Sequence, residues 1–131
     1  LLHYEPRVRT HLRYAVPLAD VAGTISDHFG EAPFFGLVTV RIADDQNHSE
    51  LGRAVERQEV VANPHASVEK AKGIRVGEWL VGLKADVVLL RESVQGKGPA
   101  YVLADAGVET RLTGAQTLTA GIAEQIEERE T

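Results

Sequence analysis

Short apolar stretches, separated by polar segments rich in glycine, proline, serine and aspartate, divide the first half of the chain. Three of them contain β-branched and aromatic residues, so we expect strands at residues 12–19, 34–42 and 54–63. The first is apolar almost throughout, which predicts a central strand. The third alternates polar and apolar positions, which predicts a half-exposed strand. Residues 44–50 are polar and are expected to form a long hairpin loop.

In the second half of the chain the apolar period changes to that of a helix. Four apolar residues recur at positions i, i+3, i+4 and i+7, on one face of a helix that we expect to begin between residues 67 and 73. They are Val76, Trp79, Leu80 and Leu83. Residues 85–90 form a short continuous apolar run, which is typical of a strand in a parallel sheet.

Two more helices and one more strand complete the pattern. Pro99 lies just inside and Gly107 just past a short apolar stretch, which is the usual arrangement at the two ends of a helix. Residues 108–112 are a possible edge strand. The last helix has Thr117 as its expected N-cap, and apolar residues recur in it at every fourth position: Leu118, Ile122 and Ile126.

These elements follow the order β-β-β-α-β-α-β-α. Three early strands followed by alternating helices and strands predict an α/β domain, with a mixed five-stranded sheet and helices on its faces. Right-handed crossovers limit the second half to a few arrangements. We place this domain at residues 12–131 and expect residues 1–11 to be the tail of a preceding domain plus a linker.

Composition excludes several kinds of site. The 131 residues include no cysteine, so disulfides, zinc–thiolate sites and cysteine-ligated iron–sulfur clusters cannot form on this chain. The net charge of -5 argues against nucleic acid as a partner, because that partner calls for a basic surface. No window approaches the roughly 20 apolar residues of a membrane helix. Any metal must therefore bind to His, Asp, Glu, backbone or an external ligand.

The strand order predicts that two histidines share one edge of the sheet. His28 comes shortly before the second strand, and His65 follows the third. In a hairpin the start of one strand lies beside the end of the next. If the first strand pairs antiparallel with the second, its end and Asp20 reach the same edge. Histidine is a common metal ligand, so this edge is a candidate metal site.

The fourth strand adds charged residues to this edge if it runs parallel to the first. Its carboxyl end is followed by Glu92, and the loop then leads through Lys97 and Gly98 into a helix N-terminus. Ligand crevices in open α/β sheets lie outside the carboxyl ends of strands, and helix N-termini near glycines favour anions. We therefore expect His28, His65, Glu92, Lys97 and Gly98 to converge on one shallow site.

Structural roles compete with this interpretation. His28 could simply hydrogen-bond the turn backbone, with Gly30 present for a positive φ. His65 could be a polar residue after an Asn-Pro turn. Lys97 has no full phosphate-loop pattern around it and could be a solvated loop lysine. Gly73 and Gly77 are expected to allow close backbone packing, and Trp79 to lie in the core.

Several stretches resemble one known family. "SDHFGEAPFF", "NPH", "GIRVGEWLVGLKADVVLL" and "GKGPAYVLADAGVE" are similar to the dinitrogenase iron–molybdenum cofactor biosynthesis family, over residues 12–126. The resemblance implies a ribonuclease-H-like three-layer fold and the binding or carrying of metal clusters or their precursors, without catalysis. The family often has two adjacent glycines after the fourth strand, where this chain has the different loop 91–98.

The resemblance and the expected sheet edge together define the candidate residues. The candidate metal ligands are His28 and His65. The wider set of candidate cofactor-binding residues is Ser26, His28, Gly30, Asn63, His65, Lys97 and Gly98. The cofactor would be a metal ion or an iron- or molybdenum-containing cluster, with Glu92 or Asp20 supplying negative charge to a bare cation.

The first six residues carry a second resemblance. "LLHYEP" is similar to the end of the cytoplasmic domain of cation diffusion facilitator transporters. This implies that the chain is the cytoplasmic C-terminal extension of a membrane cation exporter, whose membrane domain would be its partner in the same full-length protein. A homodimer is a further possible assembly.

Three functions follow from these observations. The leading interpretation is a non-catalytic module that binds a metal ion or cluster and regulates a cation efflux transporter. The alternative is a protein-interaction or dimerisation module without a ligand, using the apolar second strand or the possible edge strand at 108–112. A nuclease would need carboxylates clustered at strand ends to hold Mg²⁺. Asp86 precedes its strand, at the opposite edge from Asp20, so no such cluster is evident.

Overall fold

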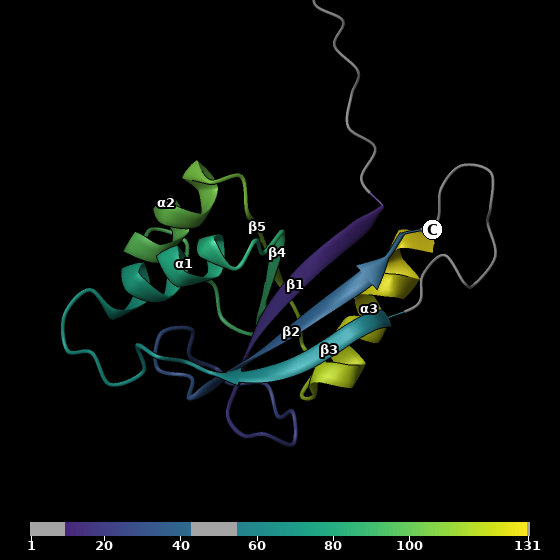
Figure 1. Ribbon diagram of the computed structural model, residues 1–131, viewed down its shortest axis with the longest axis horizontal. Coiled ribbons are helices and arrows are strands. Elements are labelled where there is room, and N and C mark those ends of the chain that lie inside the picture. Colours follow the sequence, from purple (N-terminus) through teal and green to yellow (C-terminus); the bar gives the residue numbers. More distant parts are fainter. Residues whose placement is uncertain (1–9, 43–54, 131) are drawn as a thin grey trace, which may run out of the picture.

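The computed structural model describes residues 10–42 and 55–130, with no side-chain description beyond residue 127. The transporter-like residues 1–6 and the polar loop 44–50 lie outside the described residues. Figure 1 shows the arrangement of the elements. In chain order they are β1 (His11–Leu18), β2 (Phe34–Arg41), β3 (Val55–Ala62), α1 (Lys72–Gly82), β4 (Val87–Leu90), α2 (Gly98–Asp105), β5 (Glu109–Leu112) and α3 (Leu118–Glu130).

The five strands form one mixed sheet in the order β3-β2-β1-β4-β5. β1 pairs antiparallel with β2, and β2 pairs antiparallel with β3. β4 runs parallel to both β1 and β5. The predicted α/β class, the mixed five-stranded sheet and the central first strand are confirmed. The ribonuclease-H-like classification stays a prediction.

Helices cover both faces of the sheet (Figure 1), with α1 and α2 on one side and α3 on the other. Two apolar cores result. Val88 and Leu90 of β4 point into the core under α1 and α2, whereas Val87 and Leu89 point into the core under α3. All four residues of β4 are buried, which explains why its sequence is a continuous apolar run.

The two edge strands differ from the central ones. β3 is largely exposed, as its alternating sequence predicts. At the other edge, β5 leaves Leu112 62% exposed.

β2 pairs on both sides and is buried on both faces, with Leu37 in one core and Val38 in the other. The prediction that apolar β2 is an interaction surface is therefore wrong, because its apolar side chains build the two cores.

Glycine lets α1 and α2 approach closely at their N-terminal ends. A Cβ atom on Gly73 would lie 2.8 Å from Cγ of Pro99, and one on Gly98 would lie 2.7 Å from Cγ1 of Ile74. One turn further on, a Cβ on Gly77 would lie 3.3 Å from Cγ1 of Val102. The predicted close packing at Gly73 and Gly77 is confirmed, and it brings the starts of two helices together.

Within the described part of the chain, no helix has the length and apolar character that a membrane crossing requires.

Candidate functional site

The loops that carry the candidate residues gather at one edge of the sheet. Leu18 at the end of β1 faces Phe34 at the start of β2, which in turn faces Ala62 at the end of β3. β4 runs parallel to β1 and ends at this edge as well. His28 and His65 therefore lie on the same edge, which confirms the geometric premise of the predicted site.

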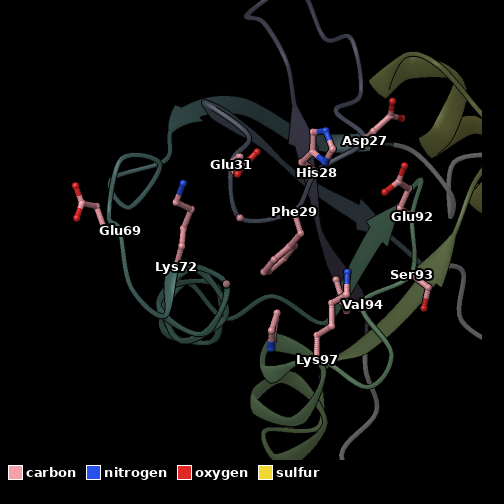
Figure 2. Close-up of a pocket in the computed structure, with 13 residues that line it drawn as sticks. Asp27, His28, Phe29, Glu31, Glu69, Lys72, Glu92, Ser93, Val94 and Lys97 are labelled. Atoms are coloured by element: carbon pink, nitrogen blue, oxygen red, sulfur yellow. The ribbon is translucent and has the colours of Figure 1, made fainter.

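An open pocket of about 580 Å³ lies at this edge. It is lined by residues from the loop before β2, the segment leading into α1 and the loop between β4 and α2. Figure 2 shows Phe29 in the middle of this lining, with His28 and Lys97 on either side of it. The lining residues are Asp27, His28, Phe29, Gly30, Glu31, Glu69, Lys72, Gly73, Glu92, Ser93, Val94, Lys97 and Pro99.

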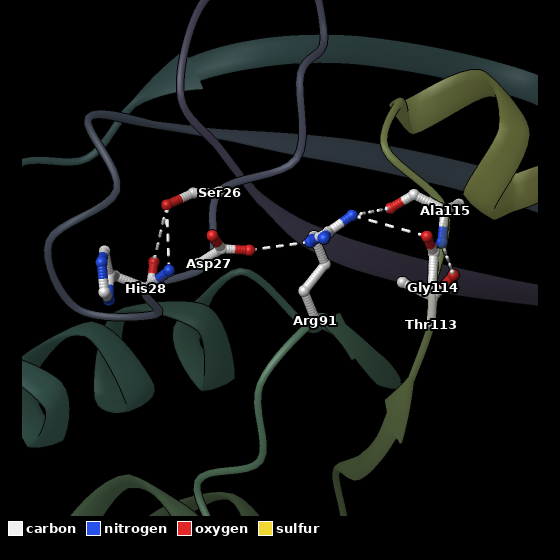
Figure 3. A network of polar contacts seen from close by, with 7 residues as sticks. All are labelled: Ser26, Asp27, His28, Arg91, Thr113, Gly114 and Ala115. Carbon is white, nitrogen blue, oxygen red and sulfur yellow. Dashed lines mark hydrogen bonds and ion pairs between the residues drawn. The ribbon is translucent and has the colours of Figure 1, made fainter.

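His28 is exposed at the pocket, and its backbone is held by the side chain of Ser26. The backbone N–H of His28 donates to Oγ of Ser26 at 3.0 Å, and that hydroxyl donates back to the His28 carbonyl at 3.2 Å. In Figure 3 the imidazole points away from these contacts. Among the described residues it has no hydrogen-bond partner. The backbone of His28, rather than its ring, stabilises the turn, and both ring nitrogens are available to a ligand.

Gly30 does not have the positive φ that the structural interpretation of this turn requires. Among the described glycines, positive φ occurs at Gly23, Gly96 and Gly107. A Cβ on Gly30 would lie 3.4 Å from the backbone nitrogen of Gly73 and from Cγ of Lys72. The prediction about φ is wrong. These distances are ordinary van der Waals contacts, so the loop lies against the start of α1 without a close approach that requires glycine.

Asn63 is buried and supports the site from beneath rather than lining the pocket. Its Nδ2 donates to the carbonyls of Gly30 and Ala32 at 3.2 and 2.9 Å, and its Oδ1 accepts from the His65 N–H at 2.9 Å. One amide thus fixes the loop before β2 against the turn after β3.

His65 is half-buried and is not one of the lining residues. Its ring meets Trp79 edge-on, with the centroids 6.4 Å apart. Trp79 contacts Phe35 and Phe35 contacts Phe29, again edge to face. The expected convergence on one pocket therefore holds for His28, Glu92 and Lys97, while His65 is connected to the pocket through a row of aromatic rings.

The pocket carries charges of both signs. Lys97 precedes α2, and Lys72 is the first residue of α1. Neither helix has a side-chain cap or an acidic residue in its first turn. Gly98 does not line the pocket, but its missing side chain lets α2 begin beside Ile74. Sequence reasoning missed Lys72, because the helix start was placed only within a window.

Asp20 contributes to a turn and is not part of the pocket lining. Its Oδ1 accepts from the backbone N–H groups of Gly23 and Thr24. These bonds, above all the one from Thr24, lower the pKa of the Asp20 carboxyl. Asp86 lies at the other end of the sheet, where it accepts from the Arg13 N–H at 2.8 Å. The two carboxylates do not meet, so the nuclease interpretation gains no support.

The donor set of the pocket suits a metal complex better than a bare ion. In the described ranges, no three His, Asp or Glu side chains are grouped so that they could hold a metal ion. The pocket offers one imidazole, two lysines and several carboxylates. A complex or cluster that brings its own ligands would need only one protein ligand, with hydrogen bonds from the lysines to its outer atoms.

Fold and pocket together define an α/β binding domain with an open site at one edge of a mixed sheet. The chain belongs to the dinitrogenase iron-molybdenum cofactor family, whose model matches residues 11–128. None of the curated proteins matches the chain.

Two solved structures are similar to this fold. One is the crystal structure of PH0822, with a TM-score of 0.66 and 21% identity, covering 89% of this chain and 92% of that one. The other is the apo form of the orange protein from Desulfovibrio gigas, with a TM-score of 0.65 and 21% identity, covering 92% of each chain. At this identity the likeness concerns the fold alone.

Proposed function

We propose that this domain is a non-catalytic module that binds a metal complex or cluster in the pocket beside His28. The observation that carries the proposal is the free imidazole. His28 lines a pocket of about 580 Å³, while its turn is held by Ser26 and the backbone. Membership of a family described by the iron–molybdenum cofactor supports a metal cluster as the ligand.

Each side chain around the pocket would make a different contact with the bound complex. The neutral imidazole of His28 would be the direct ligand to the metal. Lys72 and Lys97 would donate hydrogen bonds to oxygen or sulfur atoms of the complex, because an ammonium group offers three donors and a positive charge. Glu92 would favour a complex with a cationic edge. With no cysteine among these 131 residues, the domain supplies no thiolate, so sulfur ligands to the metal would come with the complex.

The role of His65 as a second ligand stays a prediction. Its ring contacts Trp79, and its backbone is held by Asn63. A ring rotation or a larger complex would be needed to engage both histidines. We therefore expect His28 to contribute more to binding than His65, and single substitutions can separate the two.

A more specific form of the proposal is that this module is the cytoplasmic regulatory domain of a cation efflux transporter. Its only support is the sequence of residues 1–6, which lie outside the described residues. A ligand-free dimerisation module is the alternative. Tyr101 and Leu112, 64% and 62% exposed near the edge strand β5, favour that alternative. Association that depends on concentration, without any effect of metal, would support it.

The experiment that tests the proposal is a binding panel on the purified domain. Iron, zinc, nickel, cobalt, copper, molybdate and tetrathiomolybdate are titrated by calorimetry at pH 7.5 and pH 5.5, with metal content measured by mass spectrometry. We expect at least one to bind at the higher pH and to bind more weakly at the lower, because protonated imidazole cannot ligate.

The variants of this panel are His28→Ala, His65→Ala and the double variant. The His28→Ala variant should lose binding, whereas His65→Ala should retain most of it. Unchanged binding in the double variant, or no binding of any probe by the unmodified domain, would refute the proposal. Far-UV circular dichroism checks that each variant is folded, because the fluorescence of Trp79 would respond directly to the loss of the His65 ring.

A further inference from the structure

An ion pair lies directly beside the His28 turn and ties it to the rest of the fold. Nε of Arg91 donates to Oδ1 of Asp27 at 2.8 Å. Asp27 precedes His28 and lines the pocket, while Arg91 is the first residue after β4. The two residues are 64 positions apart in the sequence.

The other end of the same guanidinium reaches a third segment (Figure 3). Nη1 of Arg91 donates to the carbonyl of Ala115 at 2.9 Å and, more weakly, to that of Gly114 at 3.4 Å. These carbonyls lie in the loop between β5 and α3. Arginine suits this position because its planar fork holds several donors in fixed directions. One side chain therefore joins the His28 turn, the end of β4 and the loop before α3.

Contacts on both sides of the His28 turn leave Asp27 and His28 as the part that Arg91 holds. The residues just before the turn are bound to the start of α3, since Ile25 N–H donates to the Gln116 carbonyl and Leu118 N–H to the Gly23 carbonyl. Ser26 N–H donates to the Pro17 carbonyl. Within residues 26–28 the turn is held by the Ser26 hydroxyl and the Asp27 carboxylate. Phe29 is then buried against Phe35, and the Gly30 carbonyl accepts from Asn63. Arg91 is therefore the side chain that connects Asp27 to the end of β4 and the loop before α3.

We propose that Arg91 is a positioning residue that holds the His28 turn in place and so presents the imidazole to the pocket. The guanidinium of Arg91 also offsets the negative charge of Asp27, which reduces the repulsion between the Asp27 side of the pocket and an anionic complex. The ordering of the turn is a property of the free protein. Its effect on affinity rests on the function proposed above.

The test compares Arg91→Gln with Arg57→Gln. Arg57 forms an exposed ion pair with Glu59 on β3, at 3.8 Å, so its substitution removes the same charge away from the pocket. Backbone order parameters of residues 26–30 are measured by ¹⁵N relaxation in the ligand-free domain. In Arg91→Gln we expect values at His28 to fall from about 0.85 toward about 0.6. In Arg57→Gln they should stay unchanged.

The second measurement is the affinity for tetrathiomolybdate. Arg91→Gln should weaken it roughly 10-fold or more, as the loss of groups that orient a metal ligand usually does. Arg91→Lys should recover part of the affinity, because one ammonium group can reach either Asp27 or the carbonyls but not both.

The outcomes separate this inference from the proposed function. Unchanged order parameters in Arg91→Gln would overturn the inference whatever the affinity does. A more mobile turn with unchanged affinity would overturn the role of Arg91 in presenting the imidazole. If the unmodified domain binds no tetrathiomolybdate but the turn becomes mobile in Arg91→Gln, the ordering role stands and the proposed function loses support.

Discussion

The side chain of Asn63 joins the two loops that carry the histidines. It is 7% exposed, and its amide satisfies two carbonyls and one N–H group. Buried polar groups that lose their partners destabilise a fold by about 1–3 kcal/mol. The residue therefore acts on the site through the geometry of the loops.

Replacing Asn63 by alanine should lower the free energy of unfolding by about 2 kcal/mol, because the carbonyls of Gly30 and Ala32 and the N–H of His65 lose their partner. Urea unfolding measures this change. Gln58→Ala, which removes an exposed amide on β3, is the control and should change stability by less than about 0.5 kcal/mol. If the two substitutions changed stability equally, the hydrogen bonds of the Asn63 side chain would contribute nothing to the free energy of unfolding.

Residue types alone did not distinguish the side chains that can bind a ligand from those that hold the loop backbone. Ser26 and Asn63 were expected to bind the cofactor, yet the polar contacts described for them are made to the loop backbone. His28 keeps a free ring in the described structure. The difference depends on side-chain directions, which the sequence pattern does not contain.

Among the elements, α1 and α2 set the shape of the pocket floor. Gly73 and Pro99 both line the pocket and touch each other across the two helices. The proline ring is rigid and cannot move aside as a flexible side chain would. A side chain at Gly73 would therefore push the start of α1 away from the start of α2.

Gly73→Ala should destabilise the domain by about 1–3 kcal/mol, because the new methyl group would lie 2.8 Å from Cγ of Pro99. Gly82→Ala in the same helix is the matched control, since the added group there meets no atom within 4 Å apart from its chain neighbours and its own helix backbone. That control should be neutral or stabilising by up to about 1 kcal/mol. Thermal unfolding measures both variants, and a stabilised Gly73→Ala would contradict the close contact.

The elements show why some boundaries could be predicted and others could not. Thr117 was expected to cap α3, and its Oγ1 accepts from the Ala120 N–H at 3.2 Å. At α1 the capping residue is Ala71, which has a φ of 56° and no side-chain hydrogen bond. Alanine gives no capping signal, so the start of α1 at Lys72 could be placed only within a window of residues.

At the scale of the whole molecule, the strand order determines what meets at the pocket. The antiparallel β1, β2 and β3 and the parallel β4 all direct a loop to one edge. This arrangement could be predicted from the order of apolar stretches, and it correctly placed His28, Glu92 and Lys97 together. The connection between Asp27 and Arg91 could not be predicted from the sequence, because it depends on how far one side chain reaches between loops.

In the proposed function, the imidazole of His28 is the direct ligand in this pocket. Long-range ¹H–¹⁵N correlation spectra of the histidine rings test it most directly, recorded at pH 7.5 before and after addition of whichever probe of the binding panel binds most tightly. The chain has five histidines, so the others serve as internal controls. We expect a large change in the chemical shifts of the His28 ring nitrogens and little change in those of His11. A bound probe that leaves the His28 ring unchanged would contradict the proposal.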